Sequence, residues 1–189
     1  MSDLDAWGPL APLIGEWEGD GGQDVSFDND EDTIAETPFR ERMTMKPFGP
    51  VDNGSQHLYG LDYRTAAWRA GEESPFHTEV GYWLWDAAAG TVMRCFVIPR
   101  GSTVLAGGQA GPADRQFTMS ATCGSEVFGV LSNPYLAKGA RTTTYTVDIT
   151  VHDDGSWSYD ETSSIEHARV AGVVAHTDRN RMRRVTEPS

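Results

Sequence analysis

Positive charge is scarce in this chain. Its 189 residues include 15 Lys and Arg against 28 Asp and Glu, a formal net charge of −13. A surface this acidic repels nucleic-acid backbones and anionic membranes, so we expect neither as a partner. Cysteine is also sparse, because only Cys95 and Cys123 occur. Two cysteines in a chain of this size do not make a disulfide framework, and their apolar or small neighbours are typical of reduced thiols.

Long apolar runs are missing as well. No segment approaches 18 consecutive apolar residues, so we expect no membrane-spanning helix. The first residues contain neither a basic region nor an apolar stretch of signal-peptide type, which favours a cytoplasmic protein. The length suits one domain, which we place at residues 1–189 with a core at roughly 10–185.

Common catalytic and metal-binding motifs are absent too. The chain has no H-E-x-x-H, C-x-x-C, G-x-S-x-G or phosphate-binding glycine loop. These absences exclude the usual zinc, serine-hydrolase and nucleotide-binding signatures. We therefore assign no side chain a catalytic role from motifs.

What the sequence does contain is a succession of short strand patterns. Glycine and proline punctuate it throughout, and no window has a clear 3.6-residue period. The pattern predicts an all-β protein, a closed antiparallel barrel of about ten strands, because closure removes exposed strand edges. Residues 4–14 are expected to form a short helix or plug before the first strand. Strands are predicted near residues 15–21, 39–45, 58–64, 76–85, 91–98, 102–106, 116–121, 142–151, 156–165 and 169–185.

Two of the five histidines have a distinctive setting. His77 lies in an aromatic-rich strand next to Phe76, and His176 follows a run of small and apolar residues at 171–175 that would let a flat ring approach the backbone. A neutral imidazole nitrogen is a suitable axial ligand for haem iron. The settings of His57, His152 and His167 give them no such role.

Several segments resemble the nitrobindins, a family of haem-binding barrels shaped like fatty-acid-binding proteins. Residues 15–21, Gly-Glu-Trp-Glu-Gly-Asp-Gly, fit the family's G-x-W-x-G-x-G signature. Residues 32–41 match its next segment in part, with Thr33 in step, and residues 75–82 are similar to its Pro-apolar-His-x-Glu-x-Gly-aromatic strand. His176 occupies the place of the family's proximal histidine, although Thr177 and Arg179 replace the Leu and Ala that the family has there.

The resemblance implies a haem b protein. It implies that His176 is the protein ligand to iron, that Thr33 lies at the haem edge, and that Phe76 and His77 face the cavity. The implied chemistry is nitric oxide binding and isomerisation of peroxynitrite to nitrate at ferric haem, with no electron partner. Trp17 is expected to plug one end of the barrel and to be structural. The oligomeric state is left open, with a homodimer as one option.

Two other functions remain open. The barrel could carry a hydrophobic molecule or fatty acid without haem, and a carboxylate would then need a buried Arg or Lys. Arg94, in an otherwise apolar strand, is the best candidate among the strand-associated arginines, which are Arg40, Arg42, Arg94 and Arg100. Alternatively, His77 and Glu79 share one face of a strand and could act as an acid–base pair. Met43 and Met45 are expected to be core.

Overall fold

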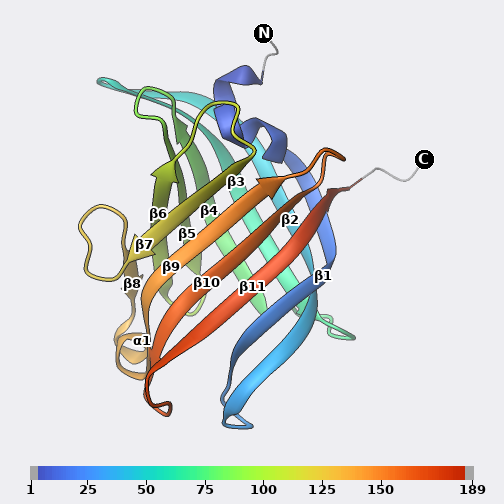
Figure 1. Cartoon of the computed structure of the whole chain (residues 1–189), viewed down its shortest axis with the longest axis vertical. Helices are drawn as coiled ribbons and strands as arrows, with labels where there is room; N and C mark the ends of the chain where they lie inside the picture. Colours follow the sequence, from blue (N-terminus) through green and yellow to red (C-terminus); the bar gives the residue numbers. More distant parts are fainter. Residues whose placement is uncertain (1–3, 186–189) are drawn as a thin grey trace.

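Eleven antiparallel strands form the body of the protein (Figure 1). The computed structural model describes residues 4–185, so the ends of the predicted domain, 1–3 and 186–189, lie outside it. The elements, in chain order, are a 3-10 helix η1 (Asp5–Leu13), β1 (Gly15–Asp28), β2 (Thr33–Asn53), β3 (Gln56–Arg69), β4 (His77–Asp86), β5 (Thr91–Ile98), β6 (Ser102–Gln109), β7 (Gln116–Thr122), β8 (Val130–Ser132), α1 (Pro134–Gly139), β9 (Ala140–Val151), β10 (Trp157–His167) and β11 (Val173–Arg184).

The sheet closes on itself. Its strand order is β5-β4-β3-β2-β1-β11-β10-β9-β7-β6-β8, and β5 also pairs with β6. Ten strands thus make the barrel, and β8 is an extra strand paired with β6. The prediction of a closed antiparallel barrel with about ten strands and a short N-terminal helix is confirmed. The short helix α1 and the full length of β2 were not predicted from the sequence.

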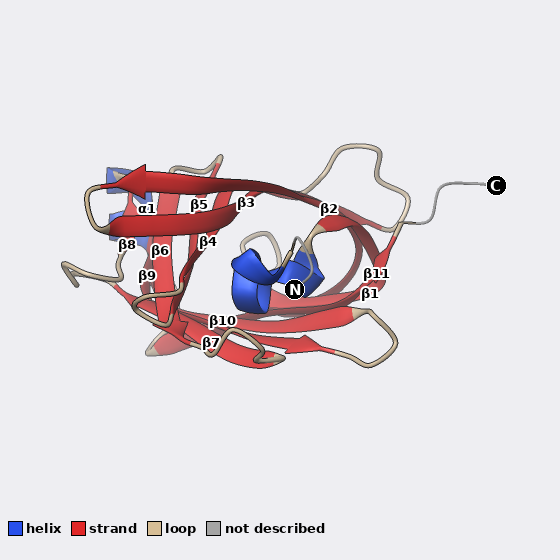
Figure 2. Ribbon diagram, turned by 90° about the horizontal axis from the view of Figure 1, so that it is seen from above, coloured by secondary structure: helices blue, strands red, loops and turns tan. Residues whose placement is uncertain are grey.

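Helix η1 covers one end of the barrel, here called the capped end (Figure 2). Leu10 and Leu13 are fully buried there. Trp17, at the start of β1, donates from Nε1 to the Leu13 carbonyl at 2.7 Å, and its ring meets that of Trp157 edge-on at 6.0 Å between centroids. The aromatic plug expected of Trp17 therefore lies directly under the helix.

The glycines after Trp17 let the first strand bend. The register of β1 shifts between Gly19 and Gly22 against β2, which marks a bulge. A Cβ on Gly19 would lie 2.6 Å from the Asn180 side chain, and a Cβ on Gly22 would lie 2.4 Å from the Phe39 ring. Both positions therefore require glycine for side chains of β11 and β2 to reach the barrel interior.

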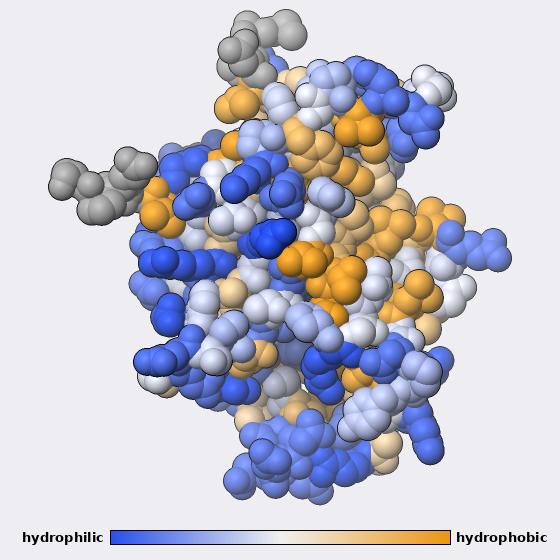
Figure 3. Space-filling view, turned by 180° about the vertical axis from the view of Figure 1, so that it is seen from behind, coloured by the Kyte–Doolittle hydropathy of each residue, from blue (hydrophilic) through white to orange (hydrophobic). Residues whose placement is uncertain are grey.

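Side chains alternate between the interior and the outer surface along most strands. In β7 every second residue is buried, as expected for a strand with one face on a core. The outer surface is largely hydrophilic, although hydrophobic groups gather in its middle on the side seen in Figure 3. No helix among residues 4–185 is long and apolar enough to cross a membrane.

Candidate functional site

A cavity lies inside the barrel, next to the aromatic layer of the capped end. The cavity, together with the space at its mouth that is open to solvent, has a volume of about 470 Å³. Trp83 and Trp157 bound it at the capped end, and its less buried wall residues, Phe76, His77 and Asp178, mark the opposite, open end. Most of the wall is aromatic or apolar, and the polar remainder consists of Glu41, Thr65, His77, Glu79, Arg94, Glu161 and Asp178. An apolar wall with a few convergent polar groups is typical of a small-molecule site.

Arg94 of β5 is the centre of the polar wall. Its Nη2 lies 2.6 Å from Glu79 Oε2, and its Nη1 lies 2.6 Å from Glu161 Oε2. Tyr63 donates to Glu79 at 2.6 Å, and Tyr145 donates to Glu161 at 2.8 Å. The guanidinium also donates to both tyrosine hydroxyl oxygens. One buried cation thus holds two carboxylates from opposite walls of the barrel.

The charges in this network determine the protonation states of Glu79 and His77. Burial alone would raise the pKa of Glu79, but Arg94 and His77 outweigh it and lower the pKa to about 2. Burial would lower the pKa of His77, but the hydrogen bond and charge of Glu79 raise it to about 8. At neutral pH Glu79 is therefore ionised, and most His77 rings carry a proton. His77 is an ion-pair partner of Glu79 rather than a neutral base beside it.

Three buried N–H donors on the cavity wall lack a hydrogen-bond acceptor among the described residues. They are Trp83 Nε1, Arg94 Nε and Trp157 Nε1. An unpaired buried donor costs about 1–3 kcal/mol. Natural structures rarely leave such groups unpaired, so three of them around one cavity are a functional signal. All three belong to residues that line the cavity.

Glu41 of β2 is the one wall carboxyl that makes no ion pair within residues 4–185. It accepts hydrogen bonds from Thr65 at 2.5 Å, Tyr159 at 2.7 Å and Asn180 at 3.2 Å. Burial nevertheless raises its pKa. Glu41 thus adds a hydrogen-bonding group to the wall at a lower cost in buried charge than an ionised carboxylate.

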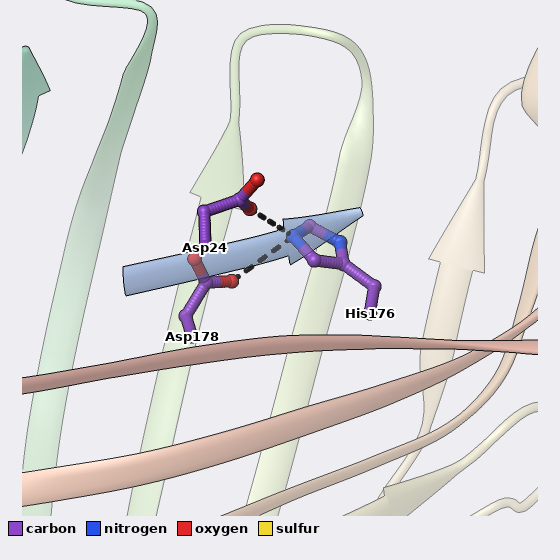
Figure 4. A group of neighbouring side chains, drawn as sticks. All are labelled: Asp24, His176 and Asp178. Carbon is purple, nitrogen blue, oxygen red and sulfur yellow. Dashed lines mark hydrogen bonds and ion pairs between the residues drawn. The ribbon is translucent and has the colours of Figure 1, made fainter. Parts of the chain in front are cut away.

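A second cluster, which we call the Asp–His–Asp cluster, consists of Asp24, His176 and Asp178 (Figure 4). His176 Nε2 lies 2.7 Å from Asp24 Oδ2 and 3.1 Å from Asp178 Oδ2, so both carboxylates reach the same nitrogen. Asp24 on β1 and Asp178 on β11 are directly paired in register, and His176 lies two residues before Asp178 on the same face of β11. Because Asp178 also lines the cavity, the cluster borders it.

The two carboxylates fix the charge of His176. Burial would lower its pKa, but the hydrogen bonds and charges of Asp178 and Asp24 raise it to about 10. The pKa of Asp178 is raised as well, to about 6, because burial outweighs the hydrogen bond and the charge of His176. His176 is therefore protonated at neutral pH and serves as the counter-charge of the two aspartates.

The structure distributes the predicted site residues over three places. Phe76 and His77 lie in the cavity wall, and their rings are neighbours. His176 faces the interior but lies in the Asp–His–Asp cluster. Thr33 is exposed at the start of β2, opposite Asp28 in the β1–β2 hairpin and away from the cavity. The position of Thr33 at the edge of a haem stays a prediction.

The sequence reasoning identified Glu79 beside His77 but missed the carboxylates of Glu161, Asp178 and Asp24. Glu161 and Asp178 stand on strands whose inward residues alternate, so a strict two-residue count from Trp157 and from His176 would have found them. Asp24 had no such signal, because the bulge between Gly19 and Gly22 changes the alternation before it. Arg94 was identified as a buried cation, and the structure shows that its partners are carboxylates of the protein itself.

A closed antiparallel barrel with one capped end and a partly polar interior cavity is the architecture of small-ligand-binding barrels. The THAP4-like, heme-binding beta-barrel domain family matches residues 6–184, and the chain belongs to this family. No curated protein matches the chain. Among solved structures, the chain is similar to the one titled "Crystal Structure of Rv2717c from M. tuberculosis", with a TM-score of 0.65 and 17% identity over 94% of this chain and 95% of that one. At this identity the likeness shows the fold alone.

Whether the barrel interior fits a haem depends on whether it presents a histidine nitrogen that can bind the iron. Iron needs an imidazole nitrogen as its axial ligand, and Nε2 of His176 already lies between Asp24 Oδ2 and Asp178 Oδ2, at 2.7 and 3.1 Å. Taking Nε2 for iron would also leave Asp24 and Asp178 facing each other across two strands without a cation. His77, the other histidine on the cavity wall, gives its Nε2 to Glu79. In this arrangement the Nε2 atoms of His176 and His77 are both engaged with carboxylates, so neither is placed to serve as an axial ligand of haem iron.

Proposed function

We propose that this barrel binds a small uncharged aromatic molecule that carries hydrogen-bond acceptors. The observation that supports this most strongly is the convergence of three unpartnered buried donors, Trp83 Nε1, Arg94 Nε and Trp157 Nε1, on one aromatic-lined cavity. Aromatic walls favour a flat apolar body, and the donors favour acceptor atoms on it. Membership of a haem-binding family supports a small-molecule ligand in general.

The charge of the wall argues against a fatty acid. Both Nη atoms of Arg94 are already paired, one with Glu79 and one with Glu161. A ligand carboxylate would meet these two negative groups and Asp178 without a free cation. Bringing an unpaired charge into this wall is costly. Of the two cargoes considered for a haem-free carrier, the neutral hydrophobic molecule is therefore the better one.

Three naphthalene probes test the ligand chemistry. 2-Acetylnaphthalene is neutral and has an acceptor, 2-methylnaphthalene is neutral without one, and 2-naphthoate is an anion. We expect 2-acetylnaphthalene to bind most tightly and to shift the indole N–H resonances of Trp83 and Trp157. Equal binding of the three probes, or binding of the anion alone, would contradict the proposal.

A matched pair of variants locates the binding in the cavity. Ala67 lies in the cavity wall, whereas its neighbour Ala66 does not line the cavity. We expect Ala67→Leu to weaken probe binding by about tenfold or more because it fills the wall, a loss of ~1.4 kcal/mol. Ala66→Leu should leave binding unchanged. The same loss in both variants would place the probe elsewhere.

A second candidate is the chemistry implied by the family. It consists of haem b binding, with nitric oxide binding and isomerisation of peroxynitrite to nitrate at ferric haem. The family match over residues 6–184 supports it, and the pairing of His176 with two carboxylates opposes it. Stopped-flow decay of peroxynitrite with hemin, in the presence and absence of the protein, tests it. Faster decay and a higher nitrate yield with the protein would favour this candidate over a haem-free carrier.

A further inference from the structure

The Asp–His–Asp cluster has the donor set of a metal site. It combines one imidazole nitrogen with two carboxylate oxygens, and these atoms lie within 4.8 Å of one another. The spacings from Nε2 to the two Oδ2 atoms, 2.7 and 3.1 Å, are close to those in a metal site. With bonds of about 2.0–2.2 Å to the ion, neighbouring ligand atoms are separated by roughly 3.0–3.4 Å. Between Nε2 and each carboxylate, shifts of a few tenths of an ångström would suffice, and the two carboxylate oxygens lie within 4.8 Å of each other.

The backbone holds these three side chains on rigid elements. Asp24 and Asp178 are directly opposite each other on paired strands, and His176 follows the same face of β11. Two aspartates in opposite positions repel each other unless a cation lies between them. The side chains are also shielded, with 8%, 23% and 30% exposure for Asp24, Asp178 and His176. A site of this kind is more precise than one built on loops.

The surroundings of the cluster favour added positive charge. Glu161 is the register partner of Asp178 on β10, so three carboxylates follow one another across β1, β11 and β10. Outside the cluster, the cavity wall contains three carboxyl groups, Glu41, Glu79 and Glu161, against two basic groups, Arg94 and His77. This excess is independent of the cluster's own geometry, and it attracts cations.

We propose that Asp24, His176 and Asp178 bind one divalent first-row transition-metal ion, of the Zn²⁺ type, at the border of the barrel cavity, and that the ion displaces the proton of His176 Nε2 into solvent. Imidazole with carboxylates suits zinc and its neighbours, whereas Mg²⁺ and Ca²⁺ take oxygen ligands. Three protein ligands leave at least one coordination position open. Through Asp178 the ion borders the cavity, so a molecule in the cavity has access to it.

Isothermal titration of the whole chain with Zn²⁺, after treatment with a chelator, tests the site. We expect one ion per chain, and Mg²⁺ or Ca²⁺ in excess should not displace it. Co²⁺ should bind as well and give a visible d–d spectrum without a thiolate charge-transfer band, which separates this site from Cys95 and Cys123. No binding of Zn²⁺, or displacement by Mg²⁺, would overturn the proposal.

Near-isosteric variants assign the ligands. Asp24→Asn, Asp178→Asn and His176→Gln should each weaken Zn²⁺ binding at least about tenfold. The exposed pair of His57 with Asp52 is the matched control, and His57→Gln should change nothing. Circular dichroism checks that each variant folds, and the Co²⁺ spectrum of the unaltered chain needs no variant. Unchanged Zn²⁺ affinity in the three ligand variants would contradict the assignment.

The metal test is separate from the proposed ligand. It uses the ion alone, so a failure of the naphthalene probes to bind does not affect it. Conversely, the Ala67→Leu variant should keep its Zn²⁺ affinity while losing probe binding. Loss of both in Ala67→Leu would mean that the cavity and the cluster are one site, and it would overturn the separate cluster.

Discussion

The capped end and the open end of the barrel interior differ in the chemistry of their side chains. Under η1 the interior is apolar, with Leu10, Leu13 and Trp17 fully buried. Further down it contains the network of Arg94 and then the Asp–His–Asp cluster. Burial of apolar groups stabilises a fold, whereas buried ion pairs contribute little net stability. The comparison indicates that the capped end maintains the fold and that the polar half serves binding.

Removing the aromatic plug should have the largest effect on stability. Trp17→Ala deletes a fully buried ring that contacts Trp157 and donates to Leu13. We expect the free energy of unfolding to fall by about 3–5 kcal/mol. Urea denaturation measures the change. A stable Trp17→Ala protein that loses only ligand binding would move Trp17 from the fold to the site.

Breaking the network of Arg94 should have the next largest effect on stability. Arg94→Met leaves Glu79 and Glu161 without their cation, and removal of one member of a buried pair typically costs about 3–5 kcal/mol. We expect the loss to shrink at acid pH, because both carboxylates can then be protonated. Urea denaturation at neutral and acid pH checks both parts. A loss independent of pH would point to packing rather than charge.

The same network predicts a pH dependence. The pKa of Glu79 is about 2 in the folded chain against 4.5 for an ordinary Glu, so its ionised form stabilises the fold above the ordinary value. This contribution, on the order of 3 kcal/mol, is lost as pH falls through 4.5 toward 2. Glu79→Gln should therefore flatten the acid side of the stability profile. An unchanged acid profile would contradict the role of Arg94 and His77 as its counter-charges.

The contribution of His77 to folding stability has the opposite dependence on pH. Its pKa is raised to about 8, so the pair with Glu79 stabilises the fold below about 6.5 and is lost as pH rises past 8. Its side chain is 35% exposed, so the effect is screened and smaller than that of Glu79. Thermal unfolding of His77→Gln and the unaltered chain at pH 6 and pH 9 measures it. A larger difference between the proteins at pH 9 than at pH 6 would contradict this sign.

Thr33 should give the smallest effect. It is exposed at the rim hairpin and lies outside the cavity. Thr33→Ala should change stability by less than about 0.5 kcal/mol and leave probe and Zn²⁺ binding unaltered. Denaturation and titration of this variant provide the check. A clear loss of ligand would extend the site to the rim.

The fold was predictable because alternation within strands and the turn residues between them are local signals in the sequence. Glycine and proline between short strand patterns indicated an antiparallel barrel, and the G-x-W-x-G-x-G segment indicated its first strand with its buried Trp17. The length of β2 was not predictable, since Pro38, Pro47 and Pro50 interrupt its pattern although all three lie within the strand. Tertiary pairing with β1 and β3 overrides this local preference.

The candidate site was predictable only in part. Alternation places His77 and Glu79 on one face of β4, but it does not show which carboxylates approach them from other strands. The partnership of His176 with Asp24 spans 152 residues and depends on the register of β1 against β11. A one-residue change of register would turn one of them away from the interior. Long-range pairing of this kind leaves no trace in local sequence.

The central claim is that His176 serves two carboxylates rather than a haem iron. A hemin titration followed at the Soret band, with the unaltered chain and His176→Ala side by side, tests it most directly. The account predicts that any haem spectrum is the same in both proteins. A Soret band that the unaltered chain develops with one equivalent of hemin, and that His176→Ala lacks while still folded, would contradict it.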